Sequence, residues 1–280
     1  MIVHALLVAA LAGGTVEATR EVGRIGKVEV GANAERRAPV ARDARKPARD
    51  ETGFTVLDPE LEGTEYAELA AEFRTARVLE DMAATLNEAI ELPVELGLRF
   101  AECGEPNAYY DPESRVVSVC FELLTHYYEV LAGEFEQESE LDDAVIGAFM
   151  FVFFHEIGHA LVDVLELPVT GREEDAVDQL SAWLLIDNGD GDEAVIHGAL
   201  SFEVSARASD EVSEDQFADE HSLDEQRVYN MLCWLYGSDP KKYAPLVDDP
   251  LPAARADRCE AEYKLLDRSW SRLLEDHVRS

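Results

Sequence analysis

The clearest chemical pattern in this sequence is His155-Glu156-Ile157-Gly158-His159, an H-E-x-x-H arrangement. On a helix, residues four apart lie on one face, so both imidazoles can bind one tetrahedral metal ion. Glu156 can then act on a water molecule bound to that ion. The pattern predicts a zinc site with His155 and His159 as ligands and Glu156 as the general base.

A zinc ion that performs chemistry needs a third protein ligand and an open fourth position. Glu174 follows His159 by fifteen residues, near the start of the next predicted helix, and Asp178 lies four residues further on. We predict Glu174 as the third ligand and Asp178 as the acceptor of the second ring N–H of a ligating histidine. Asp175 and Asp178 remain alternatives for the third ligand.

A hydrolase also needs a donor for the oxyanion that forms in its reaction. His221, Arg227 and Tyr229 flank a predicted helix start and are candidates, of which His221 is preferred. The set predicts a peptidase in which Glu156 moves the proton of a zinc-activated water. Two other functions stay open: a non-catalytic binding or regulatory module with a structural zinc site, and a zinc hydrolase acting on a non-peptide amide.

The elements that must position these residues are mainly helical. Eleven consecutive apolar or glycine residues, 144–154, run directly into His155 and predict a buried core helix, because the run is too short to span a membrane. Ser139 and Thr170 are predicted to cap this helix and the next, which ends near residue 187. Further helices are predicted at 66–90, 121–131, 192–206, 223–236 and 255–274.

Strands are predicted upstream of the core helix. Alternating apolar residues at 94–100 indicate one strand, and segments 108–110 and 115–120 indicate a hairpin. Strand 115–120 is predicted to be the sheet edge to which an extended peptide adds. The expected fold class is α+β, with a small antiparallel sheet and a mostly helical C-terminal part.

The N-terminal region has a different character. A short apolar run ends with Val16 and Ala18 at the small-residue positions of a signal-peptidase site, so we expect a signal peptide at 1–18 and a secreted or periplasmic protein. Residues 19–52 have nine basic side chains and few large apolar ones, which predicts a flexible basic linker or pro-segment. The expected domain is 53–280, with no stable membrane span after signal removal.

The chain is strongly acidic, with 24 Lys and Arg against 59 Asp and Glu and a formal net charge of −35. We therefore expect no nucleic-acid partner, because phosphate binding needs clustered basic groups. The expected partner is a peptide or protein substrate that is neutral or basic.

Four cysteines fit an exported chain and allow three pairings. Proximity in the sequence and the predicted hairpin favour disulfides between Cys103 and Cys120 and between Cys233 and Cys259.

The segment H-E-I-G-H followed by E-x-x-x-D resembles zinc metallopeptidases of the gluzincin type. A looser likeness over residues 60–265 extends to a bacterial metallopeptidase family known as a domain of unknown function. The resemblance implies a zincin-like fold, bound Zn²⁺ and peptidase activity. Carried over residue by residue, it implies His155, His159 and Glu174 as ligands, Glu156 as the base and Asp178 as the partner of a ligating histidine.

Overall fold

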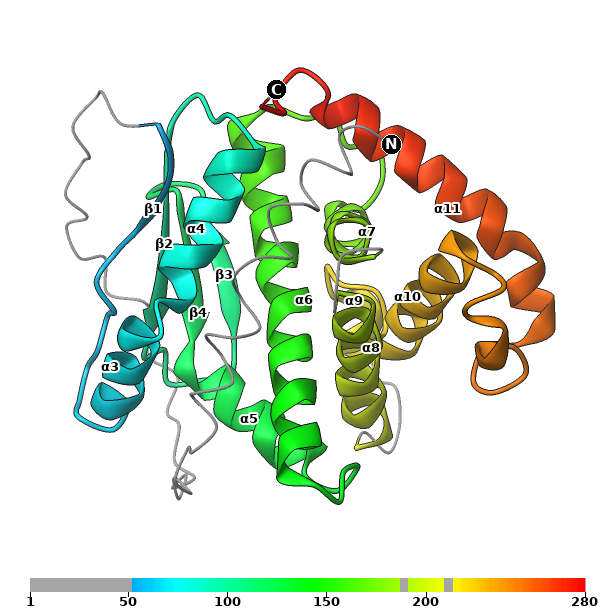
Figure 1. Ribbon diagram of the computed structural model, residues 1–280, viewed down its shortest axis with the longest axis horizontal. Helices are drawn as coiled ribbons and strands as arrows, with labels where there is room; N and C mark the ends of the chain where they lie inside the picture. The colour runs from blue at the N-terminus through cyan, green and yellow to red at the C-terminus, as the bar shows by residue number, and fades with distance from the viewer. Residues whose placement is uncertain (1–51, 187–190, 209–213, 280) are drawn as a thin grey trace.

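The computed structural model describes residues 52–186, 191–208 and 214–279 (Figure 1). The predicted signal peptide at 1–18 and all but the last residue of the predicted linker at 19–52 lie outside the described residues. The first described strand begins at Gly53.

Helices make up most of the described chain and accompany one small sheet, so the fold class is α+β as predicted. The elements are, in order, β1 (Gly53–Val56), α3 (Ala67–Thr75), α4 (Val78–Ala89), β2 (Glu95–Ala101), β3 (Ala108–Asp111), β4 (Val116–Cys120), α5 (Phe121–Leu131), α6 (Glu138–Val164), α7 (Glu173–Leu185), α8 (Gly191–Arg207), α9 (Glu214–Ala218), α10 (Asp224–Ser238), the 3₁₀ turn η1 (Ala244–Leu246) and α11 (Ala253–Leu274).

The sheet differs from the prediction in two ways. Its strand order is β1-β2-β4-β3, with β1 and β4 parallel to β2 and only β3 antiparallel to β4, so it is mixed rather than antiparallel. The prediction that strand 115–120 lies at the edge of the sheet was wrong, because this strand is β4 and lies between β2 and β3. The edge beside the hairpin is β3. A hairpin pattern reveals that two strands pair, but it does not reveal which of them also pairs with a third.

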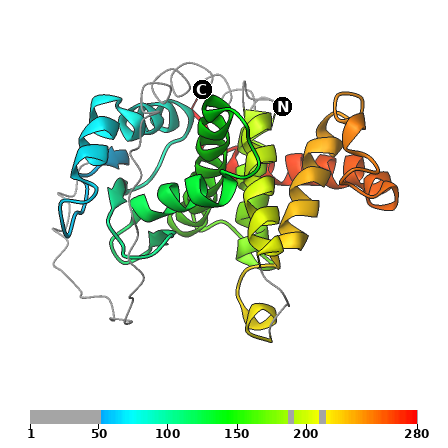
Figure 2. The same cartoon turned by 90° about the horizontal axis from the view of Figure 1, so that it is seen from below.

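Helix α6 lies between the sheet and the later helices (Figures 1 and 2). It packs against β3 and β4 on one side and against α5, α7 and α8 elsewhere. By length and composition it is the one helix in the described residues apolar enough to cross a membrane, but 72% of its most apolar window is buried inside the protein. This burial is what a core helix requires.

Both capping predictions were wrong. Helix α6 begins at Glu138, one residue before Ser139, and α7 begins at Glu173, three residues after Thr170; neither start has a side-chain cap. Acidic side chains occupy both first turns, where the positive end of the helix dipole favours a carboxylate.

The predicted helix at 66–90 is two helices. Arg77 separates α3 from α4 and has a φ of 57°, a left-handed conformation that an α-helix cannot continue through. The apolar spacing on both sides of Arg77 concealed this break. Strand β1 was also missed, since four residues are too few to establish a period-two pattern.

Both predicted disulfides are present. Cys103–Cys120 ties the β2–β3 loop to the end of β4, and Cys233–Cys259 joins α10 to α11. Each disulfide therefore links two neighbouring elements of the fold covalently.

Helix α7 approaches α6 closely at Gly158. A Cβ atom at this position would lie 2.7 Å from the Cβ of Val177, a separation that real Cβ atoms do not adopt. A further tie comes from Ser181, whose buried hydroxyl donates to the carbonyl of Phe151 at 2.7 Å. The glycine inside H-E-I-G-H thus sets the distance between the two helices.

We predict that Gly158→Ala destabilises the protein by about 1–3 kcal/mol, because the added methyl group forces α7 away from α6. The matched control is Gly133→Ala, where nothing lies within 4 Å of the added atom. Chemical denaturation measures both free energies of unfolding. Equal stability of the two variants would contradict the prediction.

Candidate metal centre

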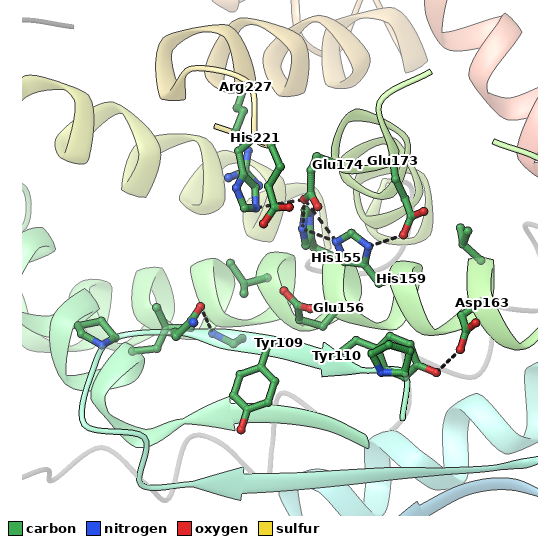
Figure 3. Close-up of a pocket in the computed structure, with 18 of the residues that line it drawn as sticks. Tyr109, Tyr110, His155, Glu156, His159, Asp163, Glu173, Glu174, His221 and Arg227 are labelled. Atoms are coloured by element: carbon green, nitrogen blue, oxygen red, sulfur yellow. Dashed lines mark hydrogen bonds and ion pairs between the residues drawn. The ribbon is translucent and has the colours of Figure 1, made fainter. Parts of the chain in front are cut away.

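Two imidazoles of α6 meet on the face turned toward α7 (Figure 3). The Nε2 atoms of His155 and His159 are 3.2 Å apart, as the four-residue spacing on one helical face allows. His155 is 3% exposed, so one of the two rings is almost fully removed from water.

Glu174 reaches this pair from the first turn of α7. Its Oε2 atom lies 3.1 Å from Nε2 of His155 and 3.3 Å from Nε2 of His159. With the 3.2 Å between the two nitrogens, the three atoms form a nearly equilateral triangle. Tetrahedral zinc with bonds of about 2.0–2.1 Å needs ligand atoms roughly 3.3 Å apart. The triangle therefore has the dimensions of three zinc ligands.

The environment of Glu174 Oε2 supports the same interpretation. The atom is buried, and no described residue meets it with full hydrogen-bond geometry, although three imidazole nitrogens lie within 3.3 Å of it. Burial alone would raise the pKa of Glu174, but the imidazoles of His155, His159 and His221 hold this pKa far below its usual range. A buried anionic oxygen surrounded by nitrogen atoms fits a cation at their centre.

Each of the three histidines has a carboxylate at its other ring nitrogen. Nδ1 of His155 is 2.7 Å from Asp178 Oδ1, and Nδ1 of His159 is 2.8 Å from Glu173 Oε1. Nδ1 of His221 is 2.9 Å from Asp219 Oδ1. A proton held at Nδ1 by a carboxylate leaves the Nε2 lone pair free for a metal. All three rings are thus oriented as metal ligands usually are.

Asp178 is itself held by a buried arginine. Arg227 donates from Nε to Oδ2 at 2.8 Å and from Nη2 to Oδ1 at 2.7 Å, and its guanidinium lies 3.8 Å from the ring centroid of Phe202. Burial raises the pKa of Asp178, but the charge of Arg227 and the hydrogen bond with His155 lower it well below its usual range. Asp178 therefore stays ionised beside His155.

His221 precedes α10 and points at the same oxygen. Its Nε2 lies 3.1 Å from Glu174 Oε2, and ligand atoms of His155, Glu174 and His221 all lie within 4.8 Å of one another. Asp219 holds both the ring and the backbone N–H of His221. The hydrogen bond with Glu174 raises the pKa of His221 to about 9. Despite its burial, His159 also has its pKa raised to about 9 by Glu174 and Glu173.

Glu156 faces the other way, toward β3 (Figure 3). It is 7% exposed, and a backbone hydrogen bond from Tyr110 reaches its carboxylate. Burial raises the pKa of Glu156, and the nearby imidazoles of His155 and His159 oppose that rise. A carboxylate with a raised pKa next to a metal position is suited to accept and return a proton.

The remaining predicted residues lie elsewhere. Asp175 accepts a hydrogen bond from the Ser222 hydroxyl at 2.6 Å. Tyr229 is 40% exposed and does not line the cleft, whereas Arg227 lines it but uses its hydrogen bonds on Asp178. Of the three oxyanion candidates, only His221 has its polar atom at the centre.

Sequence reasoning missed the supporting roles of Arg227, Glu173 and Asp219. Arg227 acts on Asp178 across 49 residues, a separation that carries no periodic signal. Glu173 and Asp219 were visible only as acidic neighbours of Glu174 and His221. In an acidic chain such neighbours are common, so their types alone did not distinguish them.

A cleft of about 660 Å³ opens over this centre. Strand β3, helix α6, the start of α7 and the segment before α10 contribute its walls. The fold and the site together define an α+β protein with a cluster of side chains at the base of a cleft that could hold a metal ion.

Residues 59–274 match the model of a family described as "Putative metallopeptidase". The chain belongs to this family. No curated protein and no solved structure matches the chain significantly.

We predict that Arg227→Met lowers zinc affinity about 10- to 100-fold, because the loss of a partner behind a ligating histidine has effects of this size. The matched control is Arg255→Met, which removes an arginine paired with Glu262 on α11. Competition with a chromophoric zinc chelator measures both affinities. Wild-type zinc affinity in Arg227→Met would show that the chain from Arg227 through Asp178 to His155 does not matter to the metal.

Proposed function

We propose that the protein is a zinc-dependent peptidase with a zincin-like catalytic domain. The observation that carries the proposal is the triangle of His155 Nε2, His159 Nε2 and Glu174 Oε2, with edges of 3.1–3.3 Å. These three residues would hold Zn²⁺. Both oxygens of Asp178 are used by Arg227 and His155, and Asp175 pairs with Ser222, which favours Glu174 over these alternatives as the third ligand.

When bound in such a site, zinc lowers the pKa of a coordinated water to about 7 and polarises a carbonyl group. Glu156 accepts the proton that the water loses as its oxygen bonds to the peptide carbonyl carbon. The same carboxylic acid then returns the proton to the departing amine nitrogen, so a carboxylic acid and an amine form. The proton of the new acid passes to the amine, and a carboxylate and an ammonium group leave the cleft. His221, with both ring nitrogens protonated and Asp219 at Nδ1, donates a hydrogen bond from Nε2 to the oxyanion.

Export is a further part of this proposal. Two disulfides favour an oxidising compartment, since such bonds persist in secreted and periplasmic proteins. We therefore keep the proposal of a signal peptide at 1–18 followed by a linker or pro-segment at 19–52.

Glu156→Gln is expected to keep its zinc and lose about 10²- to 10⁴-fold in turnover, because the glutamine cannot accept the proton. Glu174→Ala is expected to lose both zinc and turnover. Metal analysis of the purified proteins and cleavage of a mixed peptide library provide the two readouts, with Glu166→Gln, just past the end of α6, as the charge-matched control.

A wild-type protein that binds no zinc would overturn the proposal. Zinc retained by Glu174→Ala would move the third ligand to Asp175 or Asp178. Zinc without turnover in the wild type would favour the binding module, and turnover confined to other amides would favour the non-peptide hydrolase.

One contact favours the binding module as the second candidate function. His221 Nε2 lies 3.1 Å from Glu174 Oε2, close enough for His221 to complete a closed, four-ligand site of the structural kind. Loss of an oxyanion donor leaves zinc bound, whereas loss of a fourth ligand lowers the affinity for zinc.

We predict that His221→Ala keeps zinc and lowers kcat about 10²- to 10³-fold, the usual cost of losing an oxyanion donor. His126→Ala, on α5 and outside the cleft lining, is the matched control. Zinc titration and steady-state kinetics separate the two roles. A large fall in zinc affinity would instead identify His221 as the fourth ligand.

A further inference from the structure

We infer that the cleft has two chemically different ends and selects peptides that have a cationic group on the amino-terminal side of the cleaved bond and an apolar side chain on the carboxyl side. This inference rests on the proposed function, because the cleaved bond is placed at the predicted metal. The substrate class follows from three features: the open edge of β3, the acidic end of the cleft and its apolar end.

The open edge of β3 offers backbone groups to a substrate. Cys120 N–H donates to the carbonyl of Asn107, and β3 pairs with β4 in the register Ala108 to Val119 and Tyr110 to Val117. Along an antiparallel pair of strands, the backbone N–H and C=O groups of one residue bond the partner strand, and those of the next residue point away from it. Ala108 and Tyr110 therefore face away from β4. The N–H group of Tyr110 already donates a hydrogen bond to Glu156. The carbonyl groups of Ala108 and Tyr110 can accept hydrogen bonds from N–H groups of an extended peptide.

This edge also sets the direction of the peptide. Antiparallel pairing is slightly more stable per residue than parallel pairing, so the substrate is expected to run opposite to β3. Its amino-terminal part then lies beside Asp111, where β3 ends, and its carboxyl-terminal part beside Ala108, where β3 begins.

The end of the cleft near the close of β3 is acidic. Asp163 lies one turn beyond His159 on α6, is exposed, and accepts a hydrogen bond from the Tyr110 hydroxyl at 2.7 Å. Glu173, the partner of His159 Nδ1, lies at the same end (Figure 3). Among the described lining residues, Arg227 is the one Arg or Lys, and Asp178 neutralises it. A cationic group of the substrate therefore meets unneutralised carboxylate charge here.

The opposite end of the cleft has an apolar wall. Leu123 follows β4 at the start of α5, Val152 lies one turn before His155 on α6, and Phe202 comes from α8; all three line the cleft. Leu123 is only 8% exposed, so this wall belongs to the core. An apolar side chain of the substrate would replace water against these groups.

The two ends are separated by a suitable distance. Val152 and Asp163 are eleven residues apart on one helix, or about 16 Å along its axis. An extended peptide advances about 3.3 Å per residue, so roughly five residues fit between them. With the metal between the ends, each end reaches the first two residues on its side of the cleaved bond.

The test uses zinc-loaded Glu156→Gln protein as a non-cleaving trap and measures binding of fluorescent peptides by anisotropy. The forward peptide is N-acetylated, with lysine two residues before the target bond and leucine directly after it. The others replace lysine by acetyl-lysine, replace leucine by asparagine of similar shape, or exchange the two ends. A further peptide has a free amino terminus in place of the lysine, which separates the two possible sources of the cation.

We expect acetylation of the lysine to weaken binding about three- to fivefold, as for an exposed ion pair, and replacement of leucine by asparagine to weaken it roughly tenfold. The end-exchanged peptide should bind worst. Adding Asp163→Asn should abolish the difference between lysine and acetyl-lysine, whereas adding Glu166→Gln, the same charge change three residues on and outside the cleft lining, should preserve it.

Equal binding of the forward and end-exchanged peptides would overturn the inference, as would a lysine preference that survives Asp163→Asn. A preference for the free amino terminus over lysine would keep the acidic end and identify the terminal amine as its ligand. The two proposals fail in different ways. If the forward peptide binds better than the end-exchanged one but the wild type cleaves neither, the peptidase proposal is wrong and the two different cleft ends stand. If the wild type cleaves both peptides without a preference between the ends, only the inference about the ends is wrong.

Discussion

The buried carboxylate of Asp178 connects the three helices on which the candidate metal centre depends. It belongs to α7, contacts Nδ1 of His155 on α6, and accepts two hydrogen bonds from Arg227 on α10. A buried ion is costly unless it is paired and fully hydrogen-bonded, so these contacts confine the helices to one arrangement. Because Cys233–Cys259 ties α10 to α11, the constraint extends to the last helix of the fold. The centre is therefore supported by the C-terminal half of the chain as well as by its motif.

Helix α6 separates the two tasks of the site. Successive helical residues point about 100° apart, so His155 faces α7 while Glu156 faces β3. The helical side holds the candidate metal ligands, and the sheet side holds the proposed base and the strand edge. The close approach at Gly158 sets the first side, and the backbone hydrogen bond from Tyr110 to Glu156 sets the second. A change in either contact would alter one task before the other.

Local patterns predicted what depends on local spacing. The core helix, the hairpin and the meeting of His155 with His159 followed from periods of four residues on helices and two on strands. The short connection between two helices predicted that Glu174 reaches both histidines. What they missed depends on distant contacts: the parallel pairing of β2 with β4, and the bond from Arg227 to a carboxylate 49 residues earlier. The break at Arg77 was hidden because apolar spacing records which face is buried and does not record a left-handed residue.

The net charge of −35 includes acidic residues in three different environments, which the composition cannot distinguish. Asp178 and Asp219 are bound to the groups that they orient, and their charge is partly balanced there. Glu174 is directed at three imidazoles and fits a cation. Within the described part of the chain, the Asp163 carboxylate binds only a neutral hydroxyl, so its charge remains available at the cleft surface. Selectivity at such a cleft follows from the last of these environments, because a carboxylate without a cationic partner attracts a cationic ligand and a neutralised one does not.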